Sequence, residues 1–237
     1  MTDPALHRST AGVATRLVQV RTKILKQNDV VARRLRQCFH QNGVYVVSLV
    51  SSPGSGKTML LEQTLTMMRQ RGHRVAALVG DLATENDAAR LKRAEVPVRQ
   101  ITTGTVCHLE AEMLEKTLAG WQLNELDYLF VENVGNLVCP ATYDLGEDLR
   151  LVLFSTTEGE DKPLKYPTIF NTADMAVITK MDLAEVVEFD AEAAHRNIHA
   201  VRPEMEILEL SAKSGAGMQQ WLQCLEAHRA ASASAST

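Results

Sequence analysis

The chain has 237 residues and a mass of 26.1 kDa, enough for one large domain or a domain with a small extension. Hydrophobic residues make up 45% and charged residues 23%, which excludes a disordered or fibrous chain. The net charge of -4, from 25 Lys and Arg against 29 Asp and Glu, argues against sequence-independent nucleic-acid binding, which needs a basic surface. We therefore expect no nucleic-acid partner.

Neither a membrane nor a secretory pathway is indicated. The apolar runs fall well short of the roughly 20 residues that span a bilayer, and the first ten residues lack the apolar core of a secretion signal. Four cysteines are too few for a disulfide scaffold in a chain of this size. These features predict a cytoplasmic protein with no membrane partner.

The chain begins with a predicted helical extension at residues 1–43, since apolar residues recur at helical spacing over residues 12–42 and Gly43 follows. Apolar strand-like runs then alternate with amphipathic stretches. We predict strands at 44–50, 74–79, 97–102, 126–131, 149–155, 174–179 and 206–210. We predict further helices near 57–71, 85–94, 107–119, 190–200 and 215–229. This alternation indicates an α/β fold with a mostly parallel sheet over 44–229. The Ala/Ser-rich tail, 230–237, is predicted to be disordered.

A phosphate-binding loop follows the first predicted strand, in the segment S-S-P-G-S-G-K-T at residues 51–58. The pattern is that of P-loop NTPases, with serine replacing the first glycine. Backbone N–H groups of Gly54, Ser55 and Gly56 are expected to surround a phosphate at the start of a helix. Lys57 reaches the outer phosphates, and the Thr58 hydroxyl is placed to bind Mg²⁺. The domain is predicted to bind a nucleoside triphosphate.

Two later segments favour guanine over adenine. The sequence T-K-M-D at 179–182 matches the base-recognition pattern of GTPases, and it supplies Lys180 and Asp182. The carboxylate of Asp182 can accept hydrogen bonds from guanine N1–H and the N2 amino group, which adenine does not offer. Downstream, Ser211, Ala212 and Lys213 form the S-A-K segment that GTPases place against the base. The predicted nucleotides are therefore GTP and GDP.

Polar residues at the ends of two predicted strands suggest nucleotide-sensing switches. Asp81 can hold Mg²⁺, orient the attacking water, or cap the next helix. Glu132 stands where small GTPases carry the aspartate of D-x-x-G, and the Gly135 N–H is expected to sense the γ-phosphate. We predict catalytic roles for Lys57, Asp81 and Glu132. Because no glutamine is evident to position water, intrinsic hydrolysis should be slow.

Two thiols and an imidazole form a candidate metal site. Cys107 and His108 are adjacent at the start of the predicted helix 107–119, where a helix N-terminus would lower a thiol pKa, and Cys139 lies four residues after Gly135. Such ligands suit Ni²⁺, Zn²⁺ or Cu rather than Mg²⁺. The spacing matches no zinc-finger template, so from spacing alone three unrelated core or surface residues are the better interpretation.

The assembled segments SSPGSGKT, GDLATENDAARL, TGTVCHLEA, VENVGNLVCPA, TEGEDKPLKYP and TKMDL resemble the HypB family of [NiFe]-hydrogenase maturation GTPases. The resemblance covers about residues 18–228. It implies that Cys107, His108 and Cys139 form a site for Ni²⁺ or Zn²⁺ at the interface of a nucleotide- or metal-dependent homodimer. It also implies partnership with other maturation factors and a hydrogenase large-subunit precursor.

Two alternatives stay open: a GTPase that matures another nickel enzyme of the urease type, and a nucleotide-gated metal-binding module with negligible turnover. The charged segment 158–163 is predicted to be a solvated connection, although the resemblance suggests that Lys162 touches a neighbouring subunit. Cys38 and Cys224 are predicted to be packing residues, and His228 to be solvated.

Overall fold

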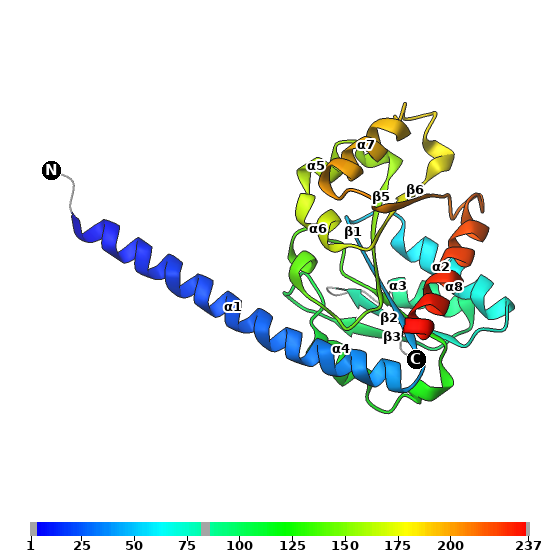
Figure 1. Ribbon diagram of the computed structural model, residues 1–237, viewed down its shortest axis with the longest axis horizontal. Coiled ribbons are helices and arrows are strands. Elements are labelled where there is room, and N and C mark those ends of the chain that lie inside the picture. Colours follow the sequence, from blue (N-terminus) through cyan, green and yellow to red (C-terminus); the bar gives the residue numbers. More distant parts are fainter. Residues whose placement is uncertain (1–3, 82–85, 236–237) are drawn as a thin grey trace.

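The sheet predicted from the apolar runs is present in the computed structural model, which describes residues 4–81 and 86–235. Seven strands pair in parallel in the order β3-β2-β4-β1-β5-β6-β7 (Figure 1). Each predicted strand is confirmed within two residues at its ends. The strands are β1 Tyr45–Ser51, β2 Val75–Asp81, β3 Val98–Thr102, β4 Tyr128–Glu132, β5 Leu149–Ser155, β6 Met175–Thr179 and β7 Glu206–Glu209.

Helices cover both faces of the sheet, because every central strand is apolar on both sides. On one face the core joins the sheet to α2, α3 and α8, and on the other face it joins the sheet to α1, α4, α6 and α7. The helices are α1 Pro4–Gln41, α2 Lys57–Gln70, α3 Asn86–Leu91, α4 Ala111–Leu118, α5 Lys162–Lys165, α6 Pro167–Thr172, α7 Ala191–Val201 and α8 Met218–Ala235.

The strand order places a ligand site beside β1. From β1 the chain passes outward to β2 and β3, returns to β4, and then continues on the opposite side of β1 with β5, β6 and β7. Such a reversal opens a crevice at the carboxyl ends of the strands, where α/β proteins bind ligands. The phosphate-binding loop, the ends of β2 and β4, and the loops after β6 and β7 all meet there.

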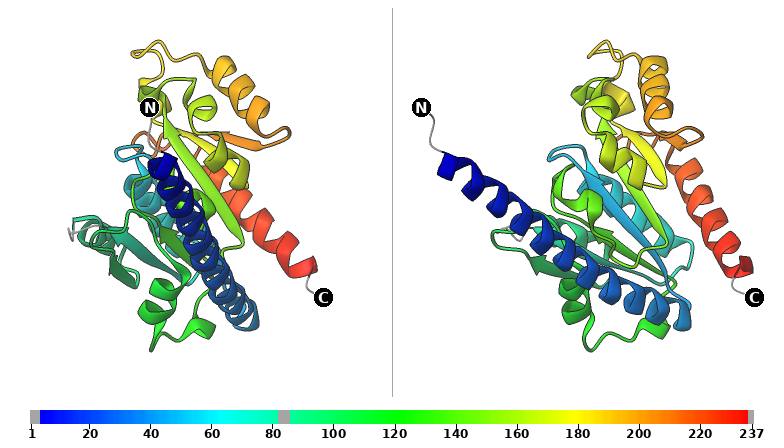
Figure 2. Two further views of the ribbon diagram at one scale, coloured as in Figure 1. Left: turned by 90° about the vertical axis from the view of Figure 1, so that its left-hand side faces the viewer. Right: turned by 60° about the vertical axis from the view of Figure 1, so that its left-hand side comes forward.

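Helix α1 extends well beyond the body that it packs on. Its 38 residues span about 57 Å. The C-terminal part buries Ala32, Leu35 and Phe39 against the sheet, whereas the N-terminal part projects away from the domain (Figures 1 and 2). Among the described residues, no helix is both long and apolar enough to cross a membrane.

Two predicted boundaries differ from the structure. The helix predicted from residue 107 begins at Ala111, so Cys107 and His108 lie in the loop before α4. Helix α8 continues to Ala235, so 230–235 are helical rather than disordered, as the high helix propensity of alanine allows. Parts of three predictions, at residues 1–3, 85 and 236–237, lie outside the described residues.

Asp127, just before β4, joins three elements and makes stability sensitive to acid. Its carboxylate accepts hydrogen bonds from the Arg74 backbone N–H at 2.8 Å, the Arg74 guanidinium at 2.9 Å and Arg229 of α8 at 3.2 Å. The hydrogen bond from the Arg74 side chain is the main cause that holds the pKa of Asp127 well below its usual range. Because the folded-state pKa lies below the unfolded one, this stabilisation is complete above about pH 4 and is lost as the pH falls further.

We expect Asp127→Asn to lower the free energy of unfolding at pH 7 by about 1–3 kcal/mol, since charged hydrogen bonds are replaced by weaker ones. The variant should also lose less stability than wild type between pH 4 and pH 2. Urea unfolding across this pH range measures both effects. Asp161→Asn removes an exposed pair with Lys165 and is the control; equal effects of the two changes would contradict the assignment.

Candidate functional site

The phosphate-binding loop leads from β1 into α2 with the backbone that its glycines predict. Gly54 and Gly56 have φ values of 76° and 91°, a left-handed region that residues with a Cβ rarely adopt. Lys57 is the first residue of α2, and its Nζ donates a hydrogen bond of 2.8 Å to Ser51 Oγ. The serine that replaces the first glycine of the motif thus holds the lysine inside the pocket.

A buried carboxylate faces this loop from the end of β4. Thr58 Oγ1 donates a hydrogen bond of 2.7 Å to Glu132 Oε1, whereas Glu132 Oε2 is buried with no hydrogen-bond partner among the described residues. Burial raises the pKa of Glu132 to about 7, although the charge of Lys57 opposes the shift and Asp81 adds to it. Burial also lowers the pKa of Lys57. A hydroxyl and an under-coordinated carboxylate are oxygen ligands that suit Mg²⁺.

The segment after β4 lies directly on the phosphate-binding loop. A Cβ added at Gly135 would lie 3.0 Å from Pro53 Cα and 3.1 Å from Pro53 N, so a larger residue would displace the loop backbone. The predicted γ-phosphate sensor is therefore beside the predicted phosphate site. Because the two backbones are in close contact, a movement of the segment at Gly135 requires a movement of the phosphate-binding loop, and the reverse.

The predicted base-recognition residues converge at the other end of the same cavity. Asp182 Oδ1 accepts a hydrogen bond of 2.6 Å from Ser211 Oγ, which fixes one oxygen and leaves the other side of the carboxylate for a ligand. Thr179 Oγ1 donates to the Ser55 carbonyl at 2.6 Å and so ties β6 to the phosphate-binding loop. Lys180 has a left-handed backbone, with φ of 58°.

A single cavity of about 590 Å³ connects these groups, a volume in the range of nucleotide-sized ligand sites. It brings together nearly all the predicted nucleotide residues. The lining includes Gly54, Gly56, Lys57, Thr58, Asp81, Glu132, Gly135, Lys180, Asp182, Ser211, Ala212 and Lys213. Ser55 is buried behind the loop instead, and its backbone faces Thr179.

The charged segment after β5 is not the solvated connection that its composition predicts. Glu158 Oε2 accepts hydrogen bonds from Ser55 Oγ at 2.7 Å and the Ser155 N–H at 2.8 Å, and Glu158 Oε1 pairs with Lys162 Nζ at 3.0 Å. Burial alone would raise the pKa of Glu158, but these contacts outweigh it and the pKa is lowered. The sequence signal was S-T-T-E at 155–158, a capping box that forms in the structure.

The two thiols and the imidazole of the candidate metal site come together. Cys107 Sγ and Cys139 Sγ are 2.6 Å apart, and one ligand atom from each of Cys107, His108 and Cys139 lies within 4.8 Å of the others. The helix N-terminus predicted at these residues is not there, since α4 begins at Ala111. The hydrogen bond with Cys107 and then burial raise the pKa of Cys139.

His108 supports a metal-ligand role. Both ring nitrogens are buried with no hydrogen-bond partner among the described residues, and the nearest carboxylate, Glu110 Oε1, is 3.5 Å from Nε2. Burial lowers the pKa of His108 although Glu110 opposes the shift, so the imidazole is neutral and able to donate a lone pair. The Tyr143 ring lies against it, with centroids 3.9 Å apart. Two sulfurs and one neutral imidazole fit Ni²⁺ or Zn²⁺.

Asn133, which the sequence analysis missed, connects the nucleotide end of β4 to this cluster. The buried Oδ1 accepts hydrogen bonds from the Leu109 N–H at 3.0 Å and the Val134 N–H at 2.9 Å. Leu109 also packs on the end of β2, since a Cβ at Gly80 would approach its side chain to 2.8 Å. The loop that carries Cys107 and His108 is therefore attached to β2 and β4, two of the strands that end at the nucleotide cavity.

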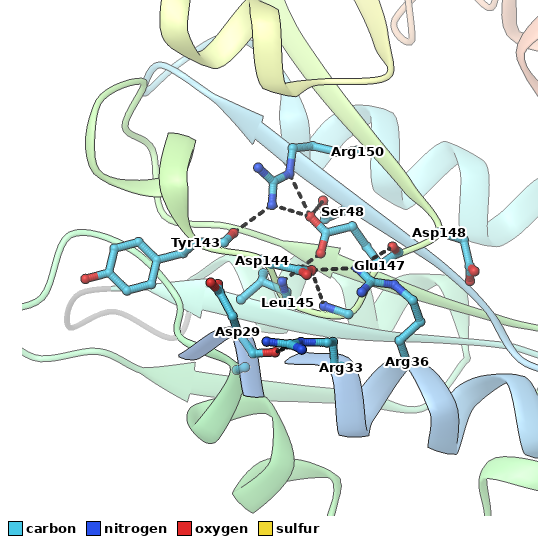
Figure 3. A network of polar contacts seen from close by, with 12 residues as sticks. Asp29, Arg33, Arg36, Ser48, Tyr143, Asp144, Leu145, Glu147, Asp148 and Arg150 are labelled. Atoms are coloured by element: carbon cyan, nitrogen blue, oxygen red, sulfur yellow. Dashed lines mark hydrogen bonds and ion pairs between the residues drawn. The ribbon is translucent and has the colours of Figure 1, made fainter. Parts of the chain in front are cut away.

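A buried polar network holds Tyr143, whose ring lies against His108 (Figure 3 shows the network). Arg150 Nε donates to Glu147 Oε1 at 2.7 Å, and Arg150 Nη2 donates to the Tyr143 carbonyl at 2.6 Å. Glu147 also accepts from Ser48 Oγ at 3.1 Å and from the Leu145 N–H at 2.7 Å. These contacts fix the backbone of Tyr143, and with it the ring that covers His108.

Helix α1 is attached to the same region. Asn28 Nδ2 donates to the Asp144 carbonyl at 2.8 Å, and Asn28 Oδ1 accepts from the Ala111 N–H at 2.9 Å. Arg36 of α1 pairs with the Asp144 carboxylate at 2.7 Å (Figure 3). No local pattern marks Asn28, because its partners lie 83 and 116 residues away.

The parallel sheet, the glycine-containing phosphate loop and the cavity at the strand ends define a P-loop NTPase with an adjoining thiol–imidazole cluster. The model of the CobW/HypB/UreG nucleotide-binding domain matches residues 45–209. The chain belongs to the HypB branch of this family, which confirms the resemblance.

Several known proteins are similar over most of the chain. Hydrogenase maturation factor HypB of Azotobacter vinelandii is 45% identical over 91% of this chain and 71% of its own length. Hydrogenase/urease maturation factor HypB of Helicobacter hepaticus is 43% identical over 90% of this chain and 88% of its own. HypB from Helicobacter pylori, solved in complex with nickel, superposes with a TM-score of 0.82 at 38% identity and covers 87% of this chain and 96% of that one.

We expect Arg150→Met to lower the free energy of unfolding by about 3–5 kcal/mol, because it leaves the buried Glu147 carboxylate without its cationic partner. The double variant Glu147→Gln/Arg150→Met should be less destabilised than Arg150→Met, since no unpaired charge remains. Urea unfolding monitored by circular dichroism gives both values. Arg196→Met, at an exposed arginine, is the control, and an equally small loss in Arg150→Met would contradict the role of the network.

Proposed function

We propose that this protein is a GTPase that binds GTP with Mg²⁺, hydrolyses it slowly, and thereby controls the insertion of nickel into a [NiFe]-hydrogenase precursor. The observation that carries the proposal is the segment 132–139. Its first part lines the nucleotide cavity, Gly135 touches the phosphate-binding loop, and Cys139 belongs to the metal cluster. A structural change at the γ-phosphate position would therefore be passed along the continuous chain from Gly135 to the metal ligand Cys139.

Phosphate chemistry is assigned to four residues in the cavity. Lys57 neutralises the outer phosphates once they displace its hydrogen bond to Ser51. Thr58 and Asp81 hold Mg²⁺, and Glu132 binds water in the inner or outer sphere of that ion. Because no group in the described part of the cavity is an evident counterpart of a water-positioning glutamine, turnover is slow until a partner or second subunit contributes.

Selection of GTP over ATP is assigned to Asp182. Ser211 fixes the orientation of the carboxylate, so its free edge is ready to accept from N1–H and the N2 amino group of guanine. Hydrogen bonds to a charged group are worth roughly 1.5–3 kcal/mol each, so the pair accounts for about 3–6 kcal/mol of discrimination. Adenine would leave the carboxylate unpaired.

The cargo is assigned to Cys107, His108 and Cys139. The donor set fits Ni²⁺ and Zn²⁺, and the relatives named above include a protein solved in complex with nickel. Three ligands leave a tetrahedral site open at one position, through which an ion can pass to an acceptor. Val138, beside Cys139, is 64% exposed, and an exposed apolar side chain next to the open position favours a site shared between two copies in a homodimer.

Maturation of a urease is the second candidate, because one similar relative carries both hydrogenase and urease in its name. A nucleotide-gated metal-binding module with negligible turnover is the third. Deletion in the cell separates the two clients by the activity that is lost. Turnover of GTP with and without metal separates a GTPase from a binding module.

We expect Asp182→Asn to weaken GTP binding by a factor of about 10² to 10⁴, the equivalent of two charged hydrogen bonds. The variant should prefer xanthosine triphosphate, because an amide can donate to the C2 carbonyl that replaces the guanine amino group. Calorimetric titration of both nucleotides measures the change. Lys213→Ala keeps Asp182 and is the matched control within the S-A-K segment; unchanged base preference in Asp182→Asn would refute the assignment.

We expect Asn133→Ala to reduce the difference in nickel affinity between the GDP-bound protein and the protein with a non-hydrolysable GTP analogue. The variant removes the hydrogen bond that attaches the Cys107–His108 loop to β4. By reciprocity, the effect of nickel on nucleotide affinity should shrink by the same factor. Asn171→Ala, on the remote helix α6, is the control. Coupling equal to wild type in Asn133→Ala would rule out this route.

The proposed function as a whole is tested by nickel and zinc binding to wild type and to Cys107→Ala/Cys139→Ala, each with GDP and with the GTP analogue. We expect one cluster-dependent ion per chain, lost in the double variant, with an affinity that differs between nucleotides. Binding at this site that ignores the nucleotide would leave a GTPase without the proposed metal switch. Equilibrium dialysis with metal analysis supplies the stoichiometry.

A further inference from the structure

A second group of metal-binding side chain types lies far from the nucleotide cavity. Glu206 is the first residue of β7, at the amino end of the edge strand, whereas the nucleotide residues follow the carboxyl ends of the strands. Cys224 and His228 lie one turn apart on α8 and face Glu206. Within the described residues, only this trio and the cluster at 107–139 bring three such ligand atoms within 4.8 Å of one another.

The Glu206 carboxylate contacts both of the other side chains, one with each of its oxygens. Cys224 Sγ lies 3.3 Å from Glu206 Oε1, and His228 Nε2 lies 3.0 Å from Glu206 Oε2. In a tetrahedral zinc site with ordinary bond lengths, ligand atoms are separated by roughly 3.4–3.6 Å. One ligand atom of each of the three residues lies within 4.8 Å of the others, so side-chain rotations would bring the three atoms around one ion.

The geometry points to a second metal site at Glu206, Cys224 and His228, for a divalent ion of borderline softness such as Zn²⁺. Cys224 and His228 are four residues apart, so their side chains lie on the same face of α8 and provide two ligands. Glu206 of β7 provides the third. His228 and Glu206 are 36% and 52% exposed at their side chains, so the fourth position opens to water. The thiolate and imidazole select against Mg²⁺.

The charges of the trio also suit a cation. Among the described ion pairs, Glu206 has His228 as its partner and no lysine or arginine. Burial and the hydrogen bond to Glu206 raise the pKa of the Cys224 thiol to about 12, so a bound ion has to replace that proton. With Glu206 and the thiolate both anionic, the site would then carry two negative charges against one divalent ion.

The site shares no residue with the cluster at 107–139 or with the nucleotide cavity. Its occupancy is therefore independent of the nucleotide, which distinguishes it from the proposed cargo site. Packing for Cys224 and solvation for His228 are the predictions from sequence, because nothing in the local sequence shows that β7 returns to meet them.

The test uses Co²⁺, whose charge-transfer absorption reports a bound thiolate, and the full-length variant Cys107→Ala/Cys139→Ala, which lacks the other thiol pair. We expect this variant to bind about one Co²⁺ per chain with a thiolate-to-cobalt band, and Zn²⁺ to displace the Co²⁺. Adding Cys224→Ala should abolish the band, and adding His228→Gln should weaken Co²⁺ binding by at least tenfold. Cys38→Ala, at another half-buried thiol, should leave the band unchanged.

Absence of the band in Cys107→Ala/Cys139→Ala, or its persistence after Cys224→Ala is added, would overturn the second site. Thermal unfolding without metal shows whether each variant is folded, and Glu206→Gln provides a variant at an exposed strand end if Cys224→Ala unfolds. Failure of the proposed cargo site has a different signature, since it would appear as nucleotide-independent metal binding in wild type with the second site intact.

Discussion

The hydrogen bond between Thr58 and the buried carboxylate of Glu132 joins the two halves of the nucleotide cavity, and the rest of the site depends on it. It holds the first turn of α2 against the end of β4 beside the ammonium group of Lys57. The chain that leaves β4 is then placed by its own covalent connection: Asn133 reaches Leu109, Gly135 meets Pro53, and Cys139 arrives beside Cys107. A single attachment at the strand end positions parts of both sites.

Most of the fold was predictable because it rests on local patterns. Strands that are buried on both faces appear in the sequence as apolar runs. The S-S-P-G-S-G-K-T segment is recognisable because its glycines allow a backbone conformation that few sequences can adopt. The start of α4 was misplaced because Cys107 and His108 continue the amphipathic pattern, whereas the buried contact of Leu109 with Gly80 keeps that stretch out of the helix. The burial of Glu158 was not predicted because the charged composition of segment 158–163 favours solvent exposure, although S-T-T-E is a capping-box pattern. Local sequence also does not reveal the roles of Asn28, Asn133 and Glu147, because their partners include residues far away in the chain.

The two candidate metal clusters differ in how the fold supports them. Cys107, His108 and Cys139 lie on loops held by hydrogen bonds to strands that end at the nucleotide, so their arrangement can respond to the ligand there. Glu206, Cys224 and His228 lie on a strand and a long helix that are packed into the core on their other faces. The first is therefore suited to transfer of an ion, and the second to retention of one.

Helix α1 has a mechanical consequence for the domain. Asn28 fixes the helix to Ala111 and to Asp144, which follow the metal-cluster residues in the chain, and about 24 residues extend beyond that point. At 1.5 Å per residue this arm is about 36 Å long, so a rotation of 10° at Asn28 would carry its tip about 6 Å. A small displacement of the segments around the thiols would therefore move the tip of this helix much further than it moves the thiols themselves.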